Sequence, residues 1–218
     1  MKYKGQLIAF SGIDGAGKST QINLLMHYLK KIGRKPVYLW SRPGDSPLFN
    51  ILKKFLRLSL GKIIPPPGPS EQREKMINKY WIRYIWVSVA LFDIALVYGI
   101  YVRLLILSGK TIVADRYLLD AWIDFKLNFP DINISERPLW KFVQWVARKP
   151  DNTFLLLIPV KESLKRSIQK KEPFPDTEQR LRKRLDIYQG LTRPHDCYLM
   201  DCTQPINIVA DKIKKYIN

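Results

Sequence analysis

A glycine-rich octapeptide near the start of the chain has the residue types and spacing that bind nucleotide phosphates. Residues 12–19 read Gly-Ile-Asp-Gly-Ala-Gly-Lys-Ser, which is a glycine, four variable positions and then Gly-Lys-Ser. The glycines let successive backbone N–H groups turn inward around phosphates, Lys18 can reach the β- and γ-phosphates, and Ser19 can ligate Mg²⁺. The run therefore predicts a site for ATP and Mg²⁺, the alternative being a glycine-rich turn without a ligand.

The predicted nucleotide loop lies between a predicted strand and a predicted helix, as phosphate binding requires. An apolar run at 7–10 precedes it as a buried strand, and a helical pattern of apolar residues follows it and ends at Gly33. The positive end of that helix then faces the phosphates. Asp14 is unusual here, because a carboxylate repels nucleotide phosphates unless it points away, so it is either a solvated turn residue or a residue facing the acceptor. The predicted ATP-binding residues are Gly12, Ile13, Asp14, Gly15, Ala16, Gly17, Lys18, Ser19 and Thr20.

Short apolar runs alternate with helical patterns along the rest of the chain. Such an alternation favours parallel strands joined by right-handed crossovers. The sequence therefore predicts an α/β fold: a three-layer P-loop NTPase domain over residues 1–218, with a five-stranded parallel sheet flanked by helices. The predicted strands are 7–10, 37–40, 111–114, 154–158 and 198–200.

Charge is the compositional anomaly, because 37 Lys and Arg against 19 Asp and Glu give a net charge of +18. A nucleic acid, an anionic membrane or a phosphate-rich substrate would each fit this surplus. The surplus is concentrated in residues 53–83 and 161–184, where aromatic residues do not alternate with the basic ones. No nucleic-acid-binding motif appears either, so we expect a phosphate site and no nucleic acid partner. Cys197 and Cys202 lack metal-site spacing, and the N-terminus lacks the pattern of a signal peptide, which favours the cytoplasm.

Two helices raise the question of a membrane. Residues 85–102 carry a single charge, Asp93, within a largely helical stretch over 70–107. A central Asp and flanking arginines argue against a membrane span, so we expect a buried helix that packs on the sheet. The basic amphipathic helix predicted over 48–60 can dock on an anionic membrane surface, but we expect its apolar side to pack on the domain beside the acceptor.

The motifs resemble those of the thymidylate kinase family. The loop reads Gly-Ile-Asp-Gly-Ala-Gly-Lys-Ser-Thr, and about a hundred residues later Val113-Ala114 lead into Asp115-Arg116-Tyr117. The likeness spans nearly the whole chain, although only these two motifs are specific. It implies a kinase that transfers the γ-phosphoryl group of Mg·ATP to dTMP, giving dTDP, and that forms a homodimer.

The resemblance assigns roles to individual residues. Asp14 would accept a hydrogen bond from a sugar hydroxyl of the acceptor, Asp115 would hold Mg²⁺ through water, and Arg116 would contact the acceptor phosphate and the transferred group. A carboxylate at the end of a strand beside the loop lies in the crevice where α/β sheets bind ligands. The alternative for Asp115 and Arg116 is an ion pair on the surface.

The family supplies cations to the transition state either from an Arg within the loop or from arginines in a lid. Because Gly15 occupies the loop position, the resemblance implies a lid, at about residues 166–184. Arg166 and Arg180 are the foremost candidates, with a solvated basic helix face as the alternative. The other candidates are Lys170, Lys171 and Arg184.

The acceptor side departs from the family. The family's helix Arg, which grips the acceptor phosphate, is missing near Asp93, and Arg42, Arg83 or Arg103 can compensate for it. Phe92 falls near the position where the family stacks the pyrimidine. The predicted substrate-binding residues are Asp14, Arg42, Phe92, Asp93, Arg116, Asp120 and Asp124.

Several carboxylates make the predicted acceptor site acidic, namely Asp45, Asp93, Asp120 and Asp124. Carboxylates pair with hydroxyls and amines and repel a monophosphate. One alternative is therefore a kinase of the same fold that acts on another nucleotide or on a sugar-like hydroxyl compound. Another is a nucleotide-binding or membrane-surface regulatory protein without catalysis.

Overall fold

The computed structural model describes residues 4–40, 43, 80–170, 176–190 and 197–217. The predicted helix over 48–60 lies outside the described residues, as do Arg42, Asp45 and the part of the predicted lid at 171–175.

A five-stranded parallel sheet forms the centre of the fold, in the order β2-β3-β1-β4-β5. Every neighbouring pair is parallel, as the alternation of strands and helices predicts. All five strands predicted from the sequence are therefore confirmed, each within two residues of its observed bounds. The strands are β1 Gln6–Gly12, β2 Pro36–Trp40, β3 Thr111–Asp115, β4 Asn152–Leu157 and β5 Cys197–Asp201.

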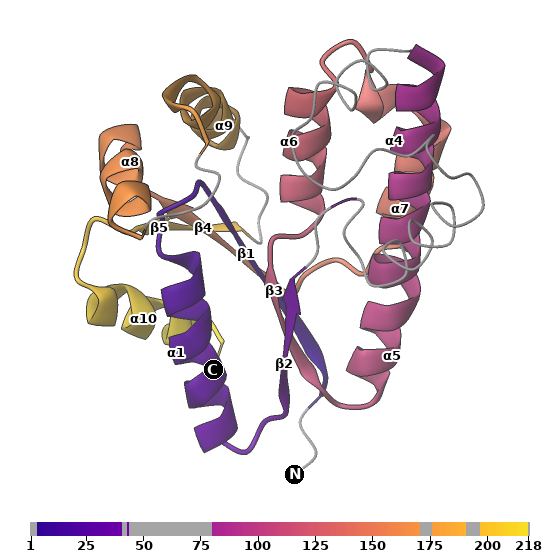
Figure 1. Ribbon diagram of the computed structural model, residues 1–218. Coiled ribbons are helices and arrows are strands. Elements are labelled where there is room, and N and C mark those ends of the chain that lie inside the picture. Colours follow the sequence, from indigo (N-terminus) through magenta and orange to yellow (C-terminus); the bar gives the residue numbers. More distant parts are fainter. Residues whose placement is uncertain (1–3, 41–42, 44–79, 171–175, 191–196, 218) are drawn as a thin grey trace.

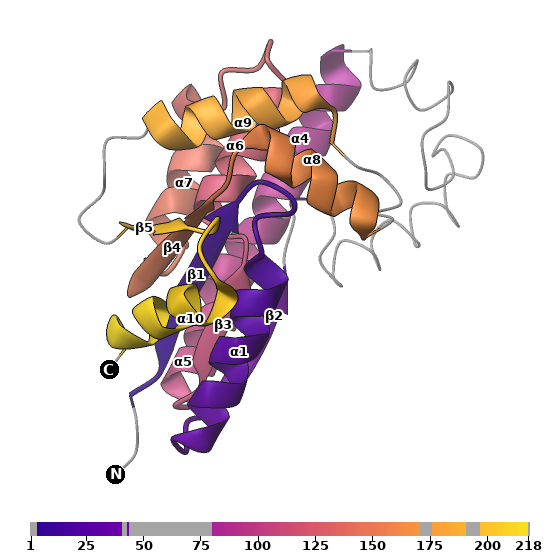
Figure 2. The same cartoon turned by 90° about the vertical axis from the view of Figure 1, so that its left-hand side faces the viewer.

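Helices cover both faces of the sheet. On one side lie α1 Lys18–Lys31 and α10 Ile206–Lys215, which contact each other (Figure 1). On the other side lie α4 Tyr80–Ala95, a π-helical segment η2 Leu96–Tyr101, α5 Val102–Leu107, α6 Leu118–Asn128, a 3-10 turn η3 Ile134–Glu136 and α7 Pro138–Val146. Two helices, α8 Val160–Gln169 and α9 Glu178–Gly190, lie near the carboxyl end of β1, and α9 contacts α6 (Figure 2). This is the three-layer α/β arrangement expected from the sequence.

Strand β1 shows why a continuous apolar run is the right signal for a central parallel strand. Successive side chains point to opposite faces. Leu7 and Ala9 join the core beneath α4 to α7, while Ile8 and Phe10 join the core beneath α1 and α10. All four are almost fully buried, so β1 contributes to the core on both sides of the sheet.

The helix Arg83–Leu107 is long and apolar enough to cross a membrane, a criterion that the core helices of soluble proteins also meet. About half of its apolar window is buried. The inward side chains of Leu91, Ile94 and Tyr98 are fully buried in the core against the sheet. The inner face therefore forms the buried helix that the sequence predicts, and the outer face remains exposed.

Gly99 marks the closest approach between this helix and α7. A Cβ added at Gly99 would lie 3.1 Å from Cγ2 and 3.2 Å from Cβ of Val146. We expect Gly99→Leu to lower the free energy of unfolding by about 1–3 kcal/mol, because the larger side chain overpacks this contact. Chemical denaturation measures the change, and Ile208→Leu on α10 is the control, since Ile208 is 48% exposed. Equal stability of the two variants would contradict the packing described here.

Candidate active site

The nucleotide loop is held between β1 and α8. Gly15 has φ 74°, and a Cβ there would lie 3.0 Å from the carbonyl oxygen of Ser163. The Ser163 hydroxyl donates a hydrogen bond of 2.6 Å to the backbone oxygen of Asp14. Position 15 therefore has no room for a side chain, which agrees with the expectation that any transition-state cation comes from outside the loop.

The N-terminus of α1 opens onto the loop without a side-chain cap. Its N-cap residue, Gly17, has φ 89° and makes no side-chain hydrogen bond, and the first turn contains no acidic residue. The first N–H groups of a helix lack partners within the helix, and the positive end of its dipole favours an anion. This geometry is suited to a phosphate.

Lys18 lies beneath the loop and is almost fully buried. Its ammonium group donates to the carbonyl oxygens of Gly12 and Ile13, both at 2.9 Å, and lies 3.8 Å from the Asp14 carboxylate. Burial, together with the positive charge of Arg116, lowers the pKa of Lys18 to about 8. The loop thus holds a desolvated cation next to the place where phosphates would bind.

A hollow of about 130 Å³ brings together three of the predicted catalytic residues, Lys18, Asp115 and Arg116, and we call it the loop hollow. It joins the loop to the carboxyl ends of β2 and β3 and to the end of α8. Its lining residues are Asp14, Gly15, Gly17, Lys18, Ser19, Trp40, Asp115, Arg116 and Lys170.

The loop hollow carries oxygen ligands suited to Mg²⁺. The Ser19 hydroxyl and the Asp115 carboxylate both belong to its lining, and Mg²⁺ is usually held by one or two such oxygens together with waters and substrate phosphates. Among the described residues there is no group of three or more His, Cys, Asp or Glu side chains that could hold a metal.

The Asp115 carboxylate also has a partner on the neighbouring strand. The Tyr38 hydroxyl donates to Asp115 at 3.1 Å, and burial together with that carboxylate raises the pKa of Tyr38 to about 12.

Arg116 enters the loop hollow from a strained backbone. Its φ is 75°, the only positive φ of a non-glycine residue in the described part of the chain, and such strain clusters at functional sites. Its backbone N–H donates to Phe10 at 2.9 Å, and its guanidinium bonds Asp14 at 2.5 Å and Asp120 at 3.3 Å. Burial alone would lower the pKa of Arg116, but the Asp120 and Asp14 carboxylates raise it. Arg116 is therefore a fixed cation.

Asp120 has a different place from the one predicted for it. Its carboxylate is 1% exposed and accepts hydrogen bonds from Ser11 at 2.6 Å, from Tyr188 at 2.6 Å and from Arg116. Burial and the Asp120 charge hold the pKa of Tyr188 well above its usual value. Asp120 thus holds Arg116 in position instead of facing an acceptor, and Tyr188 belongs to the site although the sequence did not single it out as a site residue.

The network continues one helical turn further along α6. Asp124 forms an ion pair with Arg184 of α9, so Asp120 with Tyr188 and Asp124 with Arg184 form two antiparallel links between α6 and α9. We call these links the α6–α9 ladder. Burial lowers the pKa of Arg184, but the charge of Asp124, the hydrogen bond that it accepts from Arg184 and the nearby Tyr188 together raise that pKa overall. Asp124 therefore carries a charge that is already neutralised.

Two other predicted acceptor residues lie away from these groups. Phe92 is 55% exposed on α4, and Asp93 is buried. Neither lines the loop hollow or the cavity next to the α6–α9 ladder, where Trp86 of α4 is found instead. Arg83 pairs with Asp131 at 3.0 Å, and Arg103 donates to the backbone of α7, so both candidate replacements for the missing Arg have other partners.

The predicted lid cations occupy different places. Arg166 pairs with Glu162 at 2.7 Å and donates to the carbonyl oxygens of Gly15 and Cys202 at 3.3 Å, so it packs α8 onto the loop. Arg180 donates to Asn128 of α6 at 2.7 Å. Among the described residues of the predicted lid, Lys170 lines the loop hollow, and the catalytic roles of Arg166 and Arg180 stay predictions.

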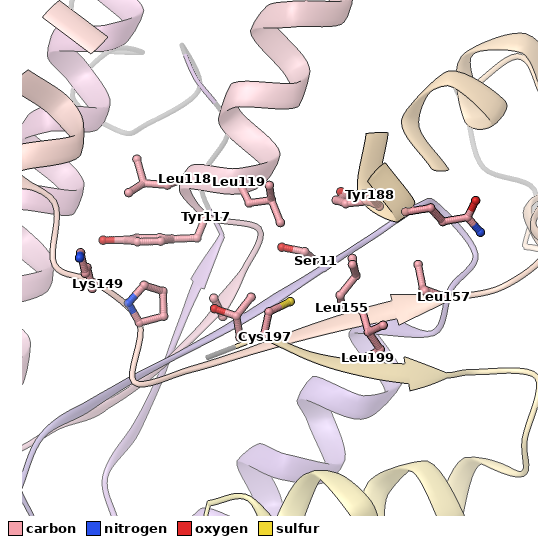
Figure 3. Close-up of a pocket in the computed structure, with 14 residues that line it drawn as sticks. Ser11, Tyr117, Leu118, Leu119, Lys149, Leu155, Leu157, Tyr188, Cys197 and Leu199 are labelled. Carbon is pink, nitrogen blue, oxygen red and sulfur yellow. The ribbon is translucent and has the colours of Figure 1, made fainter. Parts of the chain in front are cut away.

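A larger cavity, of about 480 Å³, lies on the sheet near the carboxyl end of α9 (Figure 3). Leu155, Leu157 and Leu199 of the sheet line it, and Ser11 and Tyr188 border it. Its lining is mostly apolar, which does not suit phosphates. The cavity therefore adjoins Ser11 and Tyr188 of the Asp120 network, and we do not consider it a candidate nucleotide site.

Comparison with known proteins points to one family. The sequence model of the family described as thymidylate kinase matches residues 10–62. A thymidylate kinase of Rhodopseudomonas palustris is 27% identical over 224 residues, which cover 96% of this chain and 87% of the relative. A probable thymidylate kinase of Methanobrevibacter smithii is 27% identical, with 96% and 93% covered, and the thymidylate kinase of Plasmodium falciparum is 23% identical, with 99% and 91% covered. These similarities confirm the resemblance drawn from the sequence.

The Asp120 network should be a main source of stability at the site. We expect Asp120→Ala to cost about 3–5 kcal/mol of unfolding free energy, because it leaves a buried guanidinium without one of its carboxylates. Tyr188→Phe, which removes one hydrogen bond to the carboxylate, should cost about 1.5–3 kcal/mol.

The control is Asp131→Ala. It breaks the exposed ion pair with Arg83, and we expect a cost of at most about 1 kcal/mol. Chemical denaturation followed by circular dichroism compares the three variants. A cost for Asp120→Ala no larger than that of the control would contradict the network.

Proposed function

We propose, from its relationship to the thymidylate kinases, that this kinase transfers the γ-phosphoryl group of Mg·ATP to a nucleoside monophosphate, nominally dTMP, giving dTDP and ADP. The observation that carries the proposal is the convergence of Lys18, Ser19, Asp115 and Arg116 in one hollow at the carboxyl ends of the strands. Simple nucleotide binding needs the loop alone. A strand-end carboxylate and a buried arginine beside it are what phosphoryl transfer adds.

Each residue of the loop hollow has a role in this reaction. Backbone N–H groups of the loop and of the first turn of α1 would bind the ATP phosphates, and Lys18 would turn from the loop carbonyls to the β- and γ-phosphates. Ser19 and Asp115 would hold Mg²⁺, which neutralises charge on the phosphate oxygens. Lys170 would add a cation from the predicted lid.

Arg116 would bind the phosphate of the acceptor. Its guanidinium forms ion pairs with Asp14 and Asp120. A phosphate arriving beside Arg116 would compete with Asp14, the more exposed of the two carboxylates, and would free Asp14 to accept a hydrogen bond from a sugar hydroxyl. Asp120 would keep the guanidinium in place during the exchange.

Charge pairing favours a nucleoside monophosphate over a hydroxyl-rich acceptor. The acidic acceptor site expected from the sequence rested on carboxylates facing the acceptor. Asp14 and Asp120 pair with Arg116, and Asp124 pairs with Arg184. Asp120 and Asp124 would keep their cationic partners when a phosphate binds, so their charges would not oppose it.

The test is an ADP-release assay over a panel of nucleoside monophosphates, sugars and sugar phosphates. We expect turnover with a nucleoside monophosphate, and we expect Lys18→Ala to lower it by at least about a hundredfold, because a preorganised charge at the phosphates is lost. Lys30→Ala, on the exposed face of α1, is the matched control. Turnover of sugars alone would redirect the acceptor, and an active, folded Lys18→Ala protein would overturn the donor site.

We propose further that the enzyme is a cytoplasmic homodimer. Large apolar side chains are exposed along the outer face of the helix from α4 to α5, and α7 adds more of them. Extended apolar surface of this kind marks interaction sites on soluble proteins. The exposed residues are Ile85, Phe92, Ile100, Leu104, Phe142 and Trp145.

Light scattering coupled to size-exclusion chromatography tests the dimer. The expected mass is twice the 25.6 kDa of the chain, and Leu104→Asp should halve it, because a carboxylate in an apolar interface is costly to desolvate. Ile208→Asp, at a similarly exposed position on α10, should leave the dimer intact. A wild-type monomer would contradict the proposal.

A further inference from the structure

A second polar cavity, of about 190 Å³, lies beside the α6–α9 ladder. We call it the ladder cavity. Helices α4, α6 and α9 provide most of its walls, and its lining residues are Pro43, Trp86, Asp124, Phe125, Asn128, Phe129, Asp176, Arg180 and Arg184.

Arg184 brings unused hydrogen-bond donors to this cavity. The residue is 3% exposed. Its Nη2 donates to Asp124, whereas its Nε and Nη1 are buried and have no hydrogen-bond partner among the residues that the structure describes. Buried polar atoms in native proteins nearly always have a partner, and a buried guanidinium with spare donors is costly. The spare donors of Arg184 therefore favour a ligand whose oxygen atoms accept hydrogen bonds from them. Water can take the place of such a ligand.

The charges of the ladder cavity indicate a neutral ligand group. Two carboxylates, Asp124 and Asp176, balance the guanidiniums of Arg180 and Arg184. The amide oxygen of Asn128 already accepts from Arg180. A second phosphate would meet no net positive charge here, while a carbonyl or hydroxyl oxygen would satisfy the free donors of Arg184.

The walls favour a flat ring carrying such oxygens. Trp86, Phe125 and Phe129 supply aromatic surface, and the rings of Trp86 and Phe129 lie 5.7 Å apart. Aromatic side chains bind the faces of heteroaromatic rings while polar groups read their edges. A nucleobase with carbonyl oxygens on its edge combines both properties.

The position of the cavity matches the length of a nucleoside monophosphate. Asp120, which holds Arg116, and Asp124, which holds Arg184, are one turn apart on α6, or about 6 Å along the helix axis. A phosphate bound at Arg116 therefore leaves the rest of a nucleotide within reach of the ladder cavity.

We infer that Arg184 is a specificity-determining residue whose Nε and Nη1 donate to carbonyl oxygens on the base of the acceptor nucleotide, with Asp124 holding the guanidinium in place. The inference rests on the proposed transfer to a nucleoside monophosphate and adds the part of the acceptor that is recognised. It gives α9 a role in recognising the acceptor.

The test compares Arg184→Met with the double variant Asp124→Asn/Arg184→Met, which avoids leaving a buried carboxylate alone. Arg182→Met is the matched control, because the Arg182 side chain lies on the same helix and is 58% exposed. We expect kcat/KM for dTMP to fall by about tenfold to a hundredfold in both Arg184 variants, mainly through KM, because a hydrogen bond from a charged group is lost. The Kd for ATP should not change, and the preference for dTMP over dCMP should shrink.

A second measurement separates this inference from the proposed function. Calorimetric binding of thymidine, which has no phosphate, requires no turnover and should weaken by about tenfold or more in the Arg184 variants. Failure of the wild type to phosphorylate any nucleoside monophosphate would overturn the proposed function, while Arg184-dependent thymidine binding would still support the ladder cavity. Unchanged dTMP kinetics and base preference in the double variant, or thymidine binding that is absent or independent of Arg184, would overturn the inference.

Discussion

The buried carboxylate of Asp120 is the constraint on which the site depends. It accepts hydrogen bonds from β1 through Ser11, from the end of β3 through Arg116, and from α9 through Tyr188. Arg116 adopts a left-handed backbone conformation, which costs energy for a branched or long side chain and persists only where its surroundings enforce it. The carboxylate supplies part of that enforcement. Because a buried charge is tolerated only when paired and hydrogen-bonded, the cation at the phosphate site and the carboxylate behind it require each other.

The α6–α9 ladder extends this dependence from the nucleotide loop to the predicted lid. Tyr188 and Arg184 are one helical turn apart on α9 and meet residues one turn apart on α6. A shift of α9 that breaks one link therefore strains the other. Helix α9 also contacts α8. From α8, the side chains of Ser163 and Arg166 donate hydrogen bonds to backbone oxygens of the loop. Helices α8 and α9 thus contact the nucleotide loop on one side and α6 on the other, and under the proposed function these contacts would couple the ATP and acceptor sites.

Local pattern predicted the sheet and the loop but not the pairing of charges. Each strand is a short apolar run because both faces of a parallel sheet are covered, and the loop motif is contiguous in sequence. The roles of Asp120 and Arg184 depend on which turn of α9 meets which turn of α6, and these residues are more than fifty positions apart. Periodicity within one helix carries no information about that register. Phe92 shows that sequence position alone is also insufficient within one helix. Neighbouring residues on a helix point about 100° apart. An error of one position in the alignment with the family therefore moves a side chain from the inner face of the helix to the outer one.

The net charge of +18 does not make the two cavities strongly positive. Within the described residues that line the two cavities, most charges are matched: Arg116 has two carboxylates, Arg184 has Asp124 and Arg180 has Asp176. Such pairing keeps the buried cations charged and fixed without making the site strongly positive. Under the proposed function, a phosphate would bind by replacing the Asp14 carboxylate that already lies beside Arg116, so little reorganisation would be needed. Because Gly15 leaves no room for a cation within the loop, further positive charge has to come from segments outside it, and Lys170 at the end of α8 already lies at the hollow.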